Sequence, residues 1–150
     1  MKNLKIGDKA PKINSVDQNN QAITLEQFKG NKVVLYFYPK DMTPGCTAQS
    51  CDLRDNYEKF LERDYVVLGC SVDSPARHVK FIDKYNLPFS LISDEAKKVV
   101  VDYGVWGLKK FMGREYMGIN RTTYIIDEDG FIEDIINKVD TKKHTAQILK

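Results

Sequence analysis

Two cysteines lie close together in the segment YPKDMTPGCTAQSC, residues 38–51, directly after an apolar run. Thr43 can act as a helix N-cap and Pro44 suits the first helical position, so the spacing predicts Cys46 in the first turn of a helix. The backbone N–H groups of a first turn have no carbonyl partner, and with the positive end of the helix dipole they stabilise a thiolate. Cys46 is therefore the candidate nucleophile, with a small buried hydrophobic residue as the alternative.

The other two cysteines carry weaker signals. Cys51 has no CxxC partner of the thioredoxin type, so inward helix filler is a serious alternative to a chemical role. Cys70 lies inside the apolar run YVVLGCSV and is expected to be inert packing. Three cysteines are odd in number and too few for a secreted disulfide scaffold, which favours reduced or transiently oxidised thiols.

Arg121 is the candidate cation of the site. It precedes the run TTYIID at a loop-to-strand junction. A surface arginine is the default interpretation, but a thiolate enzyme needs a positive charge near its sulfur. His78 and His144 stand alone on predicted helix surfaces, and no Cys/His spacing resembles a zinc site, so no metal is expected.

Size and charge limit the classes of function. The chain of 150 residues is about one domain, and 23 Lys and Arg against 21 Asp and Glu, well interspersed, give a net charge of +2 without a basic face. The N-terminal sequence MKNLKIGDKAPK lacks the apolar core of a secretory signal, and no apolar run approaches the ~20 residues that span a bilayer. We expect a single cytoplasmic domain over residues 1–150, with neither nucleic acid nor membrane as a partner.

Hydrophobic periodicity predicts the elements that must position these side chains. Continuous apolar runs indicate buried strands at 32–38, 65–72 and 89–92, and residues 122–127 and 131–139 form a hairpin around a Glu-Asp-Gly turn. Helices are expected from Thr43 through Leu61, from Ser74 to about Tyr85 with Val79 and Ile82 inward, and over 94–103. Helix-linked strands followed by a hairpin imply a mixed sheet covered by helices, the α/β three-layer plan.

Two segments are less regular. The first, through KINSVDQNNQAITL, indicates short edge strands around an Asn-Asn turn, and Thr24 with Gln27 forms a capping box for a brief helical turn. Residues 104–120 exceed the ~12 to 15 residues usual for structureless loops, so this stretch is partly ordered or functional. Its glycines fit no phosphate-binding motif, and Trp106 and Phe111 are expected to be core or loop anchors.

The segment from Pro39 to Cys46 resembles the peroxiredoxin pattern of Pro, three residues, Thr or Ser, two residues, Cys. The second cysteine in CTAQSC and the later GINRTTYIID are similar to the subgroup called peroxiredoxin Q or bacterioferritin comigratory protein. The likeness extends from GDKAPKI through TLEQFKG and YVVLGCSVDSP to the hairpin. This resemblance implies a thioredoxin-like fold and the reduction of hydroperoxides without a cofactor.

The resemblance also implies roles for single residues. Cys46 would be the peroxidatic thiolate and Cys51 the resolving thiol. Thr43 would hydrogen-bond the peroxide, Arg121 would hold both thiolate and peroxide, and Pro39 would shield the sulfur from water. Many peroxiredoxins have Glu three residues after the peroxidatic cysteine, where this chain has Gln, so no charge role is expected at that position.

General thiol chemistry agrees with these roles. Splitting an O–O bond requires a nucleophilic sulfur and donors that stabilise charge on the departing oxygen. The resulting sulfenic acid can condense with a second thiol, after which an external dithiol must restore the enzyme. The resemblance implies thioredoxin or a similar dithiol as that partner, and a monomeric state. Two alternatives stay open: a general thiol–disulfide oxidoreductase, disfavoured by the missing CxxC, and a peroxide sensor or chaperone-like interaction protein that uses the same cysteine.

Overall fold

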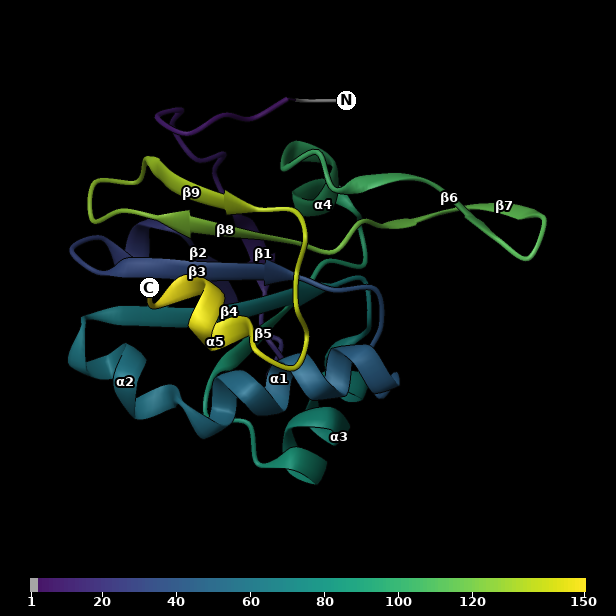
Figure 1. The fold of residues 1–150 in the computed structure, drawn as a ribbon, viewed down its shortest axis with the longest axis horizontal. Helices are drawn as coiled ribbons and strands as arrows, with labels where there is room; N and C mark the ends of the chain where they lie inside the picture. The colour runs from purple at the N-terminus through teal and green to yellow at the C-terminus, as the bar shows by residue number, and fades with distance from the viewer. Residues whose placement is uncertain (1–2) are drawn as a thin grey trace.

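A computed structural model describes residues 3–150, and within them the strands form a seven-stranded mixed sheet and a separate two-stranded one (Figure 1). The order in the large sheet is β2-β1-β5-β4-β3-β8-β9. The three central strands, β5, β4 and β3, are parallel to one another. Each of the other pairs of neighbouring strands in this sheet is antiparallel. The strands are β1 (Asn14–Val16), β2 (Ala22–Thr24), β3 (Lys32–Phe37), β4 (Tyr65–Ser71), β5 (Ser90–Ser93), β8 (Thr122–Ile126) and β9 (Ile132–Ile136).

Helices cover both faces of this sheet, which confirms the three-layer α/β plan. On β3, Val34 and Tyr36 pack with the larger helical layer, whereas Val33 and Leu35 pack with α4 and the N-terminal segment. No helix of the described residues is long and apolar enough to cross a membrane. The larger layer holds α1 (Pro44–Asp55), α2 (Tyr57–Glu62), α3 (Pro75–Tyr85) and α5 (His144–Ile148), and the other face carries α4 (Lys98–Asp102) and the short 3-10 helix η1 (Glu26–Phe28).

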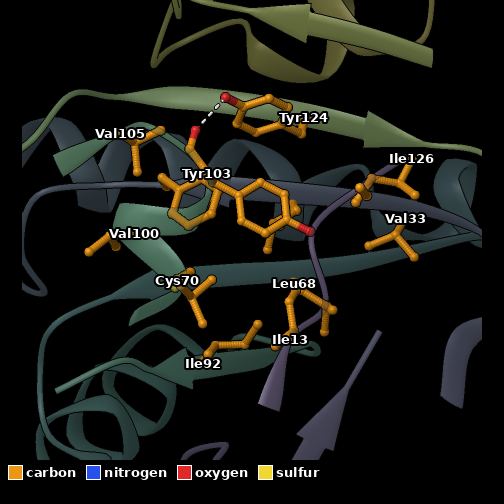
Figure 2. Packing of buried hydrophobic residues seen from close by; sticks show 14 of the residues in the cluster. Ile13, Val33, Leu68, Cys70, Ile92, Val100, Tyr103, Val105, Tyr124 and Ile126 are labelled. Atoms are coloured by element: carbon orange, nitrogen blue, oxygen red, sulfur yellow. Dashed lines mark hydrogen bonds between the residues drawn. The ribbon is translucent and has the colours of Figure 1, made fainter. Parts of the chain in front are cut away.

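Cys70 belongs to the core on the α4 side of the sheet, where aromatic and branched side chains surround it (Figure 2). It is fully buried, and burial raises the pKa of its thiol well above the usual value. Nearby, the Tyr124 hydroxyl donates to the backbone oxygen of Tyr103 at 2.6 Å. The expectation that Cys70 is packing is confirmed.

The predicted helix from Thr43 through Leu61 is wrong as one element, because it breaks at Asn56. The Asn56 side chain donates to the backbone oxygen of Asp52 at 2.8 Å, and so occupies the carbonyl that a continuing helix would use.

The helix predicted over 94–103 is also shorter than expected. Lys97 has a left-handed φ of 63°, and α4 begins only after it, with the Asp94 carboxylate accepting from the Val100 N–H at 2.8 Å.

Residues 104–120 are ordered, which confirms the expectation that this stretch is more than a structureless loop. They form β6 (Trp106–Phe111) and β7 (Arg114–Ile119), a hairpin that projects from the body of the molecule (Figure 1). Met112 and Gly113 turn the chain with φ of 52° and 78°, as a tight hairpin turn requires. Trp106 packs against the core as predicted, but Phe111 is 65 % exposed at the far end, so its expected anchoring role is wrong.

The prediction of surface positions for His78 and His144 is wrong, since both side chains are fully buried. On α3 the inward positions are taken by His78 and Phe81, while Val79 and Ile82 are only half-buried. His144 lies 2.8 Å from the Thr123 hydroxyl and 2.8 Å from Gln147 Oε1, and burial lowers its pKa. The residue type gave no sign of this burial, because Asp41 and Ile92, which bond His78, and Thr123, which bonds His144, lie far away in the sequence.

Candidate active site

The start of α1 leaves unpaired backbone donors. Thr43 has the extended conformation of an N-cap and Pro44 is the first helical residue, as predicted, but the Thr43 side chain does not cap the helix. The Thr43 hydroxyl instead donates to the Lys40 backbone oxygen at 2.8 Å. The first backbone bond back to the cap comes from the N–H of Thr47, so the N–H groups of Gly45 and Cys46 have no backbone partner within residues 3–150.

Arg121 reaches Cys46 across 75 positions of sequence. Its Nη2 donates to the Cys46 Sγ at 3.2 Å, and its Nη1 donates to Gln49 Oε1 at 2.6 Å. The sheet register explains this contact. Antiparallel pairing places Thr122 of β8 opposite Phe37 of β3, so the residue before β8 lies beside the end of β3, where the chain turns into α1. The guanidinium of Arg121 therefore places a positive charge against the Cys46 sulfur.

Local packing holds the guanidinium in place. A Cβ added to Gly45 would lie 3.3 Å from Arg121 Nη2, so this glycine allows the side chain to approach the first turn closely. Cys46 and Gln49 are both fully buried. Because Gln49 is neutral, it orients Arg121 through a hydrogen bond and leaves the positive charge to the sulfur.

Lys109 is a second cation near the site that the sequence gave no reason to select. It lies on β6, and its Nζ donates to the Ile119 backbone oxygen at 2.9 Å. Burial and then repulsion by Arg121 lower the pKa of Lys109, while the charge of Cys46 acts in the opposite direction. The projecting hairpin thus brings a second basic side chain, that of Lys109, near Arg121 and Cys46.

Cys51 lies five residues after Cys46 on α1, and Pro39 lies between β3 and α1. Cys51 is half-buried in the same helix, and both thiols are free. Helical rise and rotation over five residues separate the two Cα atoms by roughly 8 to 9 Å, whereas a disulfide tolerates about 7 Å. Pro39 is half-buried where the chain leaves β3. The structure thus brings Cys46 together with Arg121, and leaves the Cys46–Cys51 pair apart.

Comparison with known proteins gives a consistent result. Residues 6–135 match the model of the AhpC/TSA family. The chain is 46% identical over 147 residues to peroxiredoxin Bcp of Bacillus subtilis, covering 98% of this chain and 94% of that protein. It is 45% identical over 149 residues to peroxiredoxin Bcp of Escherichia coli, covering 99% and 96%.

Solved structures agree with the sequence relatives. The bacterioferritin comigratory protein of Xanthomonas campestris, whose structure was determined to explain its alkyl peroxide reduction activity, superposes with a TM-score of 0.86 at 29% identity, covering 91% of this chain and 87% of that one. The central sheet and its helices are therefore a thioredoxin-like fold. The chain belongs to the AhpC/TSA family, within its peroxiredoxin Bcp and peroxiredoxin Q group, and is a peroxidase.

Proposed function

We propose that this enzyme reduces hydrogen peroxide and alkyl hydroperoxides, with Cys46 as the peroxidatic cysteine. The single observation that supports this assignment best is the 3.2 Å contact between Arg121 Nη2 and the Cys46 sulfur. A buried cysteine with a guanidinium against its sulfur, at a helix start with free N–H groups, has the surroundings of a reactive thiolate. The alkyl hydroperoxide class is carried over from the X. campestris relative.

In the first step the Cys46 thiolate attacks the terminal oxygen of the hydroperoxide. A bond forms between sulfur and that oxygen while the O–O bond breaks, which gives a sulfenic acid and an alkoxide that takes a proton to become the alcohol, or water from hydrogen peroxide. Arg121 and the N–H groups of Gly45 and Cys46 stabilise the developing charge. The Thr43 hydroxyl already donates to Lys40, so its lone pairs are available to accept the O–H of the substrate.

The second step is a condensation of the sulfenic acid with the Cys51 thiol, which forms a disulfide and releases water. The two thiols share one intact helix, whose geometry keeps their Cα atoms too far apart for a disulfide. The first turns of α1 must therefore unwind locally before the bond can close. A dithiol protein such as thioredoxin then reduces the disulfide by thiol–disulfide exchange.

Hydrogen exchange on the reduced and oxidised forms tests this unwinding. Amides of residues 48–53 should lose protection when the disulfide forms, because their helical hydrogen bonds must break. The amides of residues 33–37 in β3 should keep their protection in both forms, since they belong to the central sheet. Unchanged protection in a sample that mass spectrometry shows to carry the Cys46–Cys51 bond would contradict the proposal.

We also propose that the enzyme acts as a monomer in the cytoplasm. The cysteine content supports the location, and the monomeric state is carried over from the resemblance to the subgroup. Neither is needed for the chemistry, which uses groups of this chain alone until the disulfide must be reduced.

A coupled assay tests the proposed function. With thioredoxin, thioredoxin reductase and NADPH, the protein should consume many equivalents of hydrogen peroxide and of an alkyl hydroperoxide such as cumene hydroperoxide. A peroxide sensor consumes roughly one equivalent per oxidation and then stops. Consumption that ends at one equivalent, with the reductant still present and active on a control disulfide, would contradict a peroxidase role.

A further inference from the structure

The loop that carries the peroxide-binding candidates is fixed by a buried polar network. Asp41, at the centre of residues 39–43, is 1% exposed, and His78 on α3 is fully buried. His78 Nδ1 lies 2.6 Å from Asp41 Oδ2, and the Tyr38 hydroxyl donates to Asp41 Oδ1 at 2.5 Å. Both oxygens of the loop carboxylate are therefore held, one by the Tyr38 hydroxyl and one by His78 of α3.

The ring of His78 is itself fixed at both nitrogens. Its Nε2 lies 3.0 Å from the Ile92 backbone oxygen, and a carbonyl only accepts, so Nε2 carries a proton. A second proton lies between Nδ1 and the Asp41 carboxylate, because two acceptors would not approach to 2.6 Å without one. The imidazole thus links the loop to the backbone of β5 through two hydrogen bonds.

A second carboxylate holds the backbone of the loop. The N–H of Asp41 donates to Asp73 Oδ2 at 2.9 Å, and Asp73 also accepts from Ser71 at 2.7 Å and from Arg77 Nε at 3.0 Å. The ligand atoms of Asp41, Asp73 and His78 lie within 4.8 Å of one another, a spacing that could suit a metal ion. Here protein donors already occupy the carboxylate oxygens, so the cluster is organised as a hydrogen-bonded network.

The backbone beside Asp41 is in an unfavourable conformation. Met42 has φ of 69°, in the left-handed region that residues with a Cβ rarely adopt, and its side chain is 38% exposed. An exposed side chain does little to hold such a conformation, so it must be imposed by the residues on either side. Asp41 is fixed by the network, and Thr43 is fixed by its bond to Lys40 and by α1.

We propose that Asp41 and His78 are positioning residues, which act as a buried clamp that sets the loop of residues 39–43 for attack by Cys46. The inference rests on the proposed function. The clamp does not touch the sulfur; it acts by fixing Met42 in its strained conformation, and hence the Thr43 hydroxyl and the first turn of α1. When the clamp is broken the loop relaxes, the acceptor for the hydroperoxide O–H moves away, and oxidation of Cys46 slows.

Two substitutions of His78 separate the clamp from simple burial. An asparagine amide is as many bonds from the backbone as Nδ1, so His78→Asn can still donate to Asp41 while it loses the bond to Ile92. A glutamine amide matches Nε2, so His78→Gln keeps the Ile92 bond and leaves Asp41 without this partner. Each variant loses the imidazole ring and one of its two hydrogen bonds, so the two variants differ in which bond is kept. Stopped-flow measurement of Cys46 oxidation by hydrogen peroxide should show a slowing of about tenfold or more in His78→Gln and less than about threefold in His78→Asn.

Asp94→Asn, Tyr38→Phe and the wild-type enzyme are measured in the same way. Asp94→Asn, which alters a buried carboxylate that caps α4 instead of this loop, should oxidise at the wild-type rate. If His78→Gln does not fold, Tyr38→Phe removes the other bond to Asp41 and should slow oxidation about threefold. Equal rates in His78→Gln and His78→Asn, or a wild-type rate in Tyr38→Phe, would overturn the clamp. A wild-type enzyme whose Cys46 does not react with peroxide would instead refute the proposed function.

Discussion

Replacement of Cys46 by serine should abolish peroxide turnover, whereas Cys70→Ser should leave it nearly intact. Of the three cysteines, all of which lie in the described part of the chain, only Cys46 combines a position at a helix start with a guanidinium 3.2 Å from its sulfur. A serine hydroxyl is not ionised at neutral pH and cannot replace the thiolate, so we expect a loss of at least about a thousandfold in kcat/KM, as is usual for removal of a nucleophile.

Cys70→Ser is the matched control for this substitution. Cys70 is equally buried, but burial raises the pKa of its thiol and keeps it neutral. Its replacement places a hydroxyl in an apolar cluster and should lower stability, so activity is compared below the unfolding temperature of each variant. Equal loss of turnover in the two folded variants would contradict the assignment of Cys46.

Arg121→Lys should slow the oxidation of Cys46 by about a hundredfold although the positive charge is kept. The guanidinium donates through Nη2 to the sulfur and through Nη1 to Gln49, and a single ammonium cannot reproduce this planar fork. Loss of a preorganised donor at developing charge usually costs ~10²–10³ in rate. The rate is measured by stopped flow with a single equivalent of hydrogen peroxide, so that the reductant plays no part.

Arg63→Lys supplies the comparison, because Arg63 is exposed at the end of α2. It should oxidise as the wild type does. If Arg121→Lys also kept the wild-type rate, Arg121 would be a structural residue whose contact with the sulfur has no role in the reaction.

The strands and the main thiol were accessible from sequence because local patterns specify them. The apolar run of β3 and the Thr43-Pro44 helix start each lie within a few residues, and the resemblance tied them to Cys46 and Arg121. The break at Asn56 was missed because it depends on a side chain competing for one carbonyl, which residue spacing does not reveal.

The network around His78 could not be predicted for a different reason. Its partners are Asp41, which lies 37 positions away, and a backbone oxygen of β5, so the residue types alone suggested an exposed histidine. The parallel pairing of β3 with β4, and of β4 with β5, brings these groups together. The role of Lys109 was hidden in the same way, because only the fold of the β6–β7 hairpin places it near Arg121.

Direct identification of the oxidised sulfur tests the central claim. Cys51→Ser removes the proposed resolving thiol, so the sulfenic acid should persist long enough to be trapped. We predict that one equivalent of hydrogen peroxide, added in the presence of dimedone, gives a single adduct that tandem mass spectrometry locates on Cys46. The wild type should instead give the Cys46–Cys51 disulfide. An adduct on Cys70, or an unmodified Cys46 after the peroxide has been consumed, would contradict the account.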